Sequence, residues 1–78
     1  MSQSIKADRS IGKNIRQYRI ARGLTQEQLS VQLQLIGCDI SRGTLAKIEA
    51  GIRHISVEEM HALKSVLGVS YDALFGDK

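Results

Sequence analysis

The sequence predicts a small all-α domain, a compact bundle of five helices. The chain has no proline and only three aromatic residues, and its apolar residues are mostly Leu, Ile, Val and Ala, a composition typical of packed helices. Apolar residues recur at intervals of three and four positions, which is the period of a helix face. Residues that favour helix starts and glycines that favour helix ends separate five such segments.

The 78 residues suffice for one domain, which we assign to residues 9–76 behind a flexible tail of residues 1–8. No apolar run is long enough to span a bilayer, and no secretory leader precedes the core. The lone Cys38 cannot form an internal disulfide, and no Cys or His spacing resembles a zinc site. We therefore expect a soluble, cytoplasmic protein without a metal or other cofactor.

The first helix is expected from about Ser10 to Gly23, which ends it. Its inner face follows from the helical spacing of Ile11, Ile15, Tyr18 and Arg22. The other arginines lie mostly around the remaining sides.

The second helix begins after Thr25, which caps it and fits a capping box with Gln28. We expect the helix to run to about Leu35 or Ile36, just before Gly37. Its inner face is predicted to consist of Leu29, Leu33 and Ile36.

The third helix, over about residues 41–50, carries the most informative surface. Ser41 is a good N-cap residue and Gly51 follows the last turn. Leu45 and Ile48 fall on the inner side, whereas Arg42, Thr44 and Lys47 project from the other. Hydrogen-bond donors near a helix N-terminus suit a DNA major groove. The alternative is a short amphipathic helix with an ordinary solvated face.

The rest of the chain predicts a loop over residues 52–55 and two more helices. Ser56 begins a second capping box with Glu59, and Gly68 ends that helix. Its inner residues are predicted to be Val57, Met60, Leu63 and Leu67. Ser70 caps a last short helix that runs to about Phe75. No strand is expected.

Charge is distributed unevenly along the chain. Residues 1–22 hold six basic residues against one acid, and residues 23–78 hold five bases against seven acids. A basic segment on a compact domain indicates a polyanionic partner. An ordinary solvated helix face is the alternative for this segment taken alone.

No catalytic set emerges from the titratable residues. His54 and His61 occupy unrelated positions, and Cys38 has no histidine beside it. Glu58 and Glu59 are adjacent, so on a helix they do not face each other. We therefore expect a protein that is not an enzyme.

Taken together, a basic first helix, a capped second helix, a turn and a donor-faced third helix predict a helix-turn-helix. The residues resemble the Xre/Cro-type helix-turn-helix regulators, which include the lambda-like phage repressors. The resemblance lies in residues 11–16 (IGKNIR), 22–29 (RGLTQEQL), 40–51 (ISRGTLAKIEAG) and 67–75 (LGVSYDALF). It implies a lambda repressor-like fold.

The expected DNA-binding residues come from this resemblance and from the donors at the helix starts and in the loop. They are Thr25, Gln26, Ser41, Arg42, Gly43, Thr44, Lys47 and Arg53. The resemblance implies base contacts for Arg42, Gly43 and Thr44, and a phosphate contact for Gln26. It also implies a buried ion pair between Arg19 and Glu49.

Two features depart from the family pattern. The link between Leu33 and Ile40 is several residues longer than the usual turn, so the second helix gains a turn or the loop bulges. Gly43 stands where a side chain commonly reads a base, which allows either close approach of the backbone to DNA or a less selective reader.

We therefore expect a stand-alone, sequence-specific regulator of transcription, a repressor that binds double-stranded DNA as a homodimer and takes no small-molecule ligand. The expected dimer surface comprises Val66, Val69, Tyr71, Leu74 and Phe75. The alternative for Leu74 and Phe75 is that they complete the core of the monomer. The alternative for the whole chain is a helical protein–protein module, antitoxin-like or partner-binding, with weak or no DNA binding.

Overall fold

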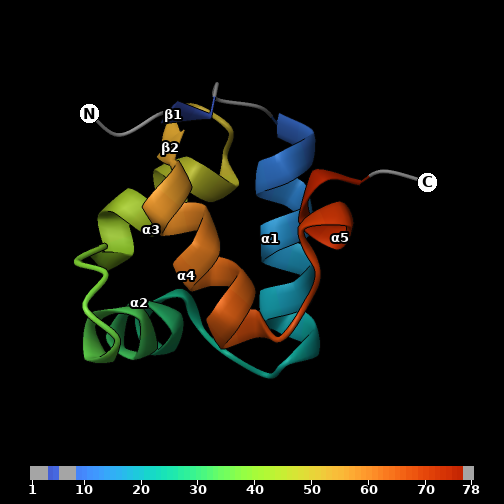
Figure 1. Cartoon of the computed structure of the whole chain (residues 1–78). Coiled ribbons are helices and arrows are strands. Elements are labelled where there is room, and N and C mark those ends of the chain that lie inside the picture. The colour runs from blue at the N-terminus through green and yellow to red at the C-terminus, as the bar shows by residue number, and fades with distance from the viewer. Residues whose placement is uncertain (1–3, 6–8, 77–78) are drawn as a thin grey trace.

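The computed structural model of the chain describes residues 4–5 and 9–76 and contains the five predicted helices (Figure 1). These are α1 (Arg9–Ala21), α2 (Gln26–Leu35), α3 (Arg42–Glu49), α4 (Val57–Leu67) and α5 (Tyr71–Phe75). The predicted all-α bundle of five helices is thereby confirmed. Two short strands, β1 (Ser4–Ile5) and β2 (Ile55–Ser56), complete the fold.

The expectation that the chain has no strand was wrong. Strands β1 and β2 pair in an antiparallel ladder that sets Ser4 opposite Ser56 and Ile5 opposite Ile55. Residues 4–5 therefore belong to the folded domain, although they fall within the predicted tail. The remaining tail positions, 1–3 and 6–8, lie outside the described residues. A two-residue strand is too short to produce an alternating sequence pattern.

One core connects all five helices. Its buried apolar side chains are Ile11, Ile15, Leu29, Leu33, Ile40, Leu45, Ile48, Ile55, Met60, Ala62, Leu63, Leu67 and Leu74. The helical period correctly placed nine of these residues, namely Ile11, Ile15, Leu29, Leu33, Leu45, Ile48, Met60, Leu63 and Leu67. Burial of this apolar surface is the main favourable term in folding.

The period failed at helix ends. Ile36 was expected to face inward but is 54% exposed, because α2 ends one residue earlier. Val57 was expected on the inner face of α4 but is 43% exposed at the first helical position. Arg22 lies past the end of α1, is exposed, and donates to the Leu67 carbonyl oxygen at 3.1 Å.

The predicted N-caps are confirmed. Ser41 and Ser70 each accept a hydrogen bond from a backbone N–H three residues ahead. Thr25 forms its capping box with Gln28, and Ser56 forms the second box with Glu59. Each cap satisfies a donor that a helix start leaves without a partner.

Helix α1 packs closely against two other parts of the bundle (Figure 1). At Gly12 it approaches the last turn of α3 so closely that an added Cβ would lie 2.5 Å from the carbonyl oxygens of Ile48 and Glu49. Near α5, the Asn14 side-chain amide donates to the Leu74 carbonyl oxygen at 2.9 Å. Helix α1 therefore fixes both the end of α3 and the last helix of the chain.

Candidate nucleic-acid interface

The turn between α2 and α3 is a packed loop that follows the end of α2 at Leu35. Residues 36–41 connect the two helices. Cys38 donates its backbone N–H to the Leu33 carbonyl oxygen at 2.9 Å, and its side chain packs against the core. Ile40 is buried. The α2–α3 turn thus holds α3 against α2 through Cys38 and Ile40.

A buried network of polar groups joins α1, the start of α2 and the end of α3. Arg19 donates from Nε and Nη2 to the two carboxylate oxygens of Glu49, at 2.7 and 3.0 Å. The side chains are only 9% and 3% exposed. Arg19 Nη1 also donates to the Leu24 carbonyl oxygen at 2.8 Å, and Gln26 Nε2 donates to Glu49 Oε1 at 3.1 Å. The ion pair that the family resemblance implied is present, and it fixes the C-terminal end of α3.

The opposite side of α3 faces solvent. Arg42, Gly43 and Lys47 are exposed on it. The structure shows no hydrogen bond or ion pair between the Arg42 or Lys47 side chain and another described residue. Their charges and N–H donors are therefore available to a ligand.

Ser41 and Thr44 are occupied by the helix cap. The Ser41 hydroxyl accepts from the Thr44 backbone N–H at 3.1 Å and lies 3.0 Å from the Thr44 hydroxyl. Thr44 is half-buried and Ser41 is exposed. Any contact that these two residues make with a ligand must coexist with the cap.

The start of α2 offers backbone donors. The Thr25 hydroxyl accepts from the Gln28 N–H, and the Gln28 side chain accepts from the Thr25 N–H. The first N–H groups of a helix have no partner within it, and the helix dipole favours an anion there. The Gln26 amide is held beside this helix start by its hydrogen bond to Glu49.

Arg53 is less available than the sequence suggested. Its guanidinium donates to both carboxylate oxygens of Glu59, at 2.8 and 3.0 Å, and to the His54 carbonyl oxygen at 2.9 Å. The hydrogen bonds from Arg53 hold the pKa of the Glu59 carboxyl below its usual value, although partial burial opposes the shift. The sequence assigned Glu59 to the capping box of Ser56 but missed this partner. The pair ties the loop after α3 to the start of α4.

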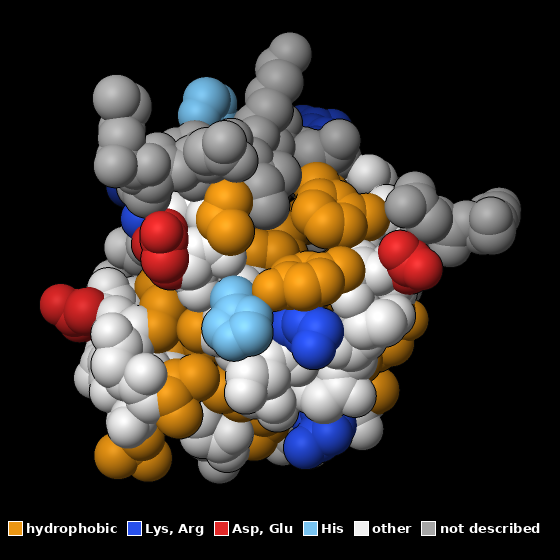
Figure 2. Space-filling model, viewed as in Figure 1, with side chains coloured by type: hydrophobic (Ala, Val, Ile, Leu, Met, Phe, Trp, Pro, Cys, Tyr) orange, Lys and Arg blue, Asp and Glu red, His pale blue; other side chains and the backbone are white. Residues whose placement is uncertain are grey.

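The expected dimer surface is only partly exposed. Leu74 is fully buried, so it completes the monomer core and its assignment to the dimer surface was wrong. Tyr71 and Phe75 are each 37% exposed, whereas Val66 and Val69 are half-buried against the core. Figure 2 shows apolar side chains gathered on this face of the molecule around an exposed histidine.

The Tyr71 side chain bridges α5 and α4. Its hydroxyl lies 2.9 Å from Nδ1 of His61, and Lys64 Nζ lies 5.3 Å from the centre of its ring. These contacts leave part of the ring exposed and hold it in a fixed orientation. The sequence assigned His61 no partner, because the hydrogen bond joins two helices.

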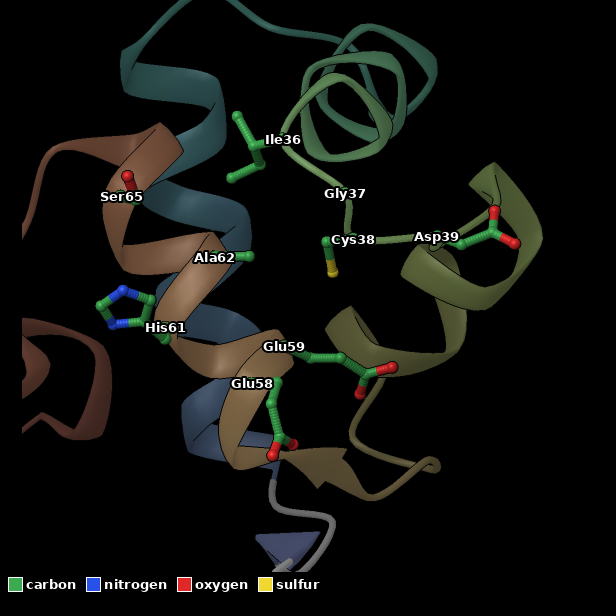
Figure 3. A pocket seen from close by; sticks show the side chains of 9 residues that line it. All are labelled: Ile36, Gly37, Cys38, Asp39, Glu58, Glu59, His61, Ala62 and Ser65. Atoms are coloured by element: carbon green, nitrogen blue, oxygen red, sulfur yellow. The ribbon is translucent and has the colours of Figure 1, made fainter. Parts of the chain in front are cut away.

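An open pocket of about 490 Å³ lies between the α2–α3 turn and α4 (Figure 3). The turn contributes Cys38 and Asp39, and α4 contributes Glu58, Glu59 and His61. Burial, with the nearby Glu59 charge, raises the pKa of the Cys38 thiol and so keeps it in its less reactive form. Among the described residues, no group of three or more His, Cys, Asp or Glu side chains is placed to bind a metal ion.

Comparison with known proteins identifies the family. Residues 15–74 match the helix-turn-helix family over a span that includes α2, the turn and α3. The chain belongs to the helix-turn-helix family. The chain also resembles a crystal structure of the restriction-modification controller protein C.AhdI from Aeromonas hydrophila. The two are 27% identical, with a TM-score of 0.75, over 86% of this chain and 90% of that one.

The family and the similar structure together support a helix-turn-helix regulator of transcription that binds DNA. No curated protein matches the chain. Within the part of the chain that the structure describes, no helix has the length and apolar character needed to cross a bilayer.

Proposed function

We propose that the chain is a sequence-specific, double-stranded DNA-binding repressor that inserts α3 into the major groove as one half of a homodimer. The observation that carries this proposal is the outward face of α3, where Arg42 and Lys47 are exposed and without a partner among the described residues. The same helix is held from behind by buried Leu45 and Ile48 and by the Arg19–Glu49 pair. Such support fixes the position of the helix that carries the donor side chains.

The proposed contacts fall into two groups. Arg42, Gly43, Thr44 and Lys47 face base edges in the groove, where an arginine can donate two hydrogen bonds to a guanine. The DNA phosphate backbone is contacted by Thr25, Gln26 and Ser41. A phosphate also lies close to the backbone N–H groups at the start of α2. Arg53 adds a minor phosphate contact through its remaining N–H groups, because Glu59 already balances its charge.

A repressor of this kind acts in the cytoplasm by occupying a promoter. The likeness to C.AhdI, a restriction-modification controller protein, suggests that the regulated genes belong to a restriction-modification system. The alternative is a helical protein–protein module, antitoxin-like or partner-binding, which would need neither exposed cation on α3.

Binding of the purified protein to labelled genomic duplex fragments, followed by fluorescence anisotropy over a salt series, tests the proposal. We expect binding at or below micromolar protein that weakens steeply with salt, because phosphate contacts release counterions. Selection from a random duplex pool then gives the preferred sequence. Absence of salt-dependent binding at micromolar protein would favour the partner-binding module instead.

Arg42→Ala separates reading of bases from attraction to DNA. We expect a loss of roughly 1–3 kcal/mol on the preferred site and relaxed preference at one base pair, because one bidentate base contact disappears. Binding to random duplex should change much less. Arg53→Ala is the matched control and should weaken binding to all sequences to the same small extent. Equal losses on preferred and random DNA for Arg42→Ala would contradict its role as a base reader.

Dimerisation is the second expected property. One recognition helix reads only a few base pairs, so two half-sites about 10 bp apart, or a multiple of this spacing, are needed to select a site. We propose that Tyr71 and Phe75, with the half-buried Val66 and Val69, form the contact between protomers. Sedimentation of the free protein should show a dimer. Titration of a duplex that carries two half-sites should saturate at two protomers per duplex.

Phe75→Asp should shift this equilibrium toward the monomer, because it places a charge in an apolar contact. Asp72→Ala, on the same short helix, is a control that should leave it unchanged. A monomer that binds a single half-site as tightly as the pair would argue against the dimer.

A further inference from the structure

We infer that Gly43 is the point at which the backbone of α3 itself lies against DNA, so that the lack of a side chain there sets how closely the helix approaches the duplex. The inference rests on the proposed function and extends it to the mode of recognition. Position 43 then acts by leaving room for DNA, and not through a side chain that reads a base.

The fold gives no internal reason for a glycine at this position. Gly43 is not among the glycines with positive φ, so any residue can adopt its backbone conformation. A Cβ added at Gly43 would meet no atom of the described residues within 4 Å. By contrast, a Cβ at Gly12 would collide with backbone oxygens of α3. Glycine is also among the least favourable residues within a helix, so the domain forgoes stability at Gly43.

The residues nearest Gly43 on this side of α3, half-buried Ala46 and exposed Ala50, are also small. Gly43, Ala46 and Ala50 follow one another at intervals of three and four positions, and therefore share one side of α3. Arg42 and Lys47 lie on either side of this line. The centre of the face thus carries no atom beyond Cβ, while a long cationic side chain lies on each side.

This arrangement suits close approach to a polyanion. Without a side chain at position 43, the helix backbone can come within van der Waals distance of the duplex, and the two cations can reach outward to base edges or phosphates. A longer side chain at this position would hold the whole helix farther from the groove and would strain both cationic contacts.

The test compares Gly43→Ala with the parent chain in two measurements. Thermal unfolding should show a higher Tm, by at most roughly 4–8 °C, because alanine stabilises a helix where it has free space and position 43 lies in the first turn of α3. Anisotropy on the preferred duplex should show binding weaker on the order of tenfold, because an extra methyl group must fit a close contact. Ser65→Ala in α4, at an exposed position, is the control: it should also favour its helix but leave DNA binding unchanged.

Gly43→Gln provides a second variant, since its long amide could read a base. We expect it to bind more weakly than Gly43→Ala on every sequence in the selected pool. Tighter or more selective binding by Gly43→Gln, or unchanged binding by Gly43→Ala, would overturn the inference while leaving the proposed function in place. If the parent itself shows no salt-dependent binding, the proposed function fails and this inference fails with it.

Discussion

Glu49→Ala should lower the free energy of unfolding by about 3–5 kcal/mol, because it leaves the Arg19 guanidinium buried without its anion. It also removes the acceptor for the Gln26 amide at 3.1 Å. A loss of this size is a large share of the stability of a small domain. Urea unfolding followed by circular dichroism measures it, and the midpoint should fall without a matching change in slope.

Two controls identify burial of the unpaired charge as the cause. Glu58→Ala removes an exposed glutamate from the first turn of α4, and it should cost no more than about 1 kcal/mol. The double variant Arg19→Met, Glu49→Leu removes both charges, and it should be considerably more stable than Glu49→Ala. Unfolding of Glu49→Ala at the parent's urea midpoint would contradict the structural role of the pair.

Gly12→Ala should destabilise the domain by roughly 1–3 kcal/mol, although alanine is the better helix former. The added Cβ would lie 2.5 Å from the carbonyl oxygens of Ile48 and Glu49. These are backbone atoms and cannot rotate away as a side chain would, so α1 and α3 must move apart. The separation would loosen the helix contact beside the Arg19–Glu49 pair. Thermal unfolding gives the change as a lower Tm.

Gly43→Ala is the matched comparison, because it makes the same substitution within a helix but into free space. The two variants should therefore shift Tm in opposite directions. A rise in Tm for Gly12→Ala would mean that α1 and α3 adjust their separation without loss, and that their close approach is not required.

Local features of this domain were predictable from sequence. The N-caps at Thr25, Ser41, Ser56 and Ser70 depend on residues within one helical turn, so short motifs identify them. The exposure of Arg42 and Lys47 likewise follows from helical spacing. Face assignments failed at Ile36 and Val57, because a periodic pattern does not mark the residue at which a helix begins or ends.

Features that depend on distant parts of the chain were not predictable in this way. The pairing of β1 with β2, the hydrogen bond between His61 and Tyr71, and the burial of Leu74 each require the tertiary arrangement. The Arg53–Glu59 pair joins residues close in sequence, but strand β2 and the start of α4 lie between them and determine whether they meet. The Arg19–Glu49 pair was expected only from the family resemblance. No rule of residue spacing could have joined residues 30 positions apart. The only indication in the sequence that α1 and α3 approach closely is the glycine at position 12.

The short β1–β2 ladder has a consequence for the order in which the molecule opens. Its two residue pairs connect chain segments about fifty positions apart, so closing it costs more chain entropy than closing the helical contacts within α2 and α3. A two-stranded ladder of this length adds little stability alone. Strand β1 should therefore detach in local fluctuations that leave the helical core intact, and the amides of Ser4 and Ile5 should exchange with solvent long before those of α1. During such openings the loop after α3 remains tied to α4 through Arg53 and Glu59.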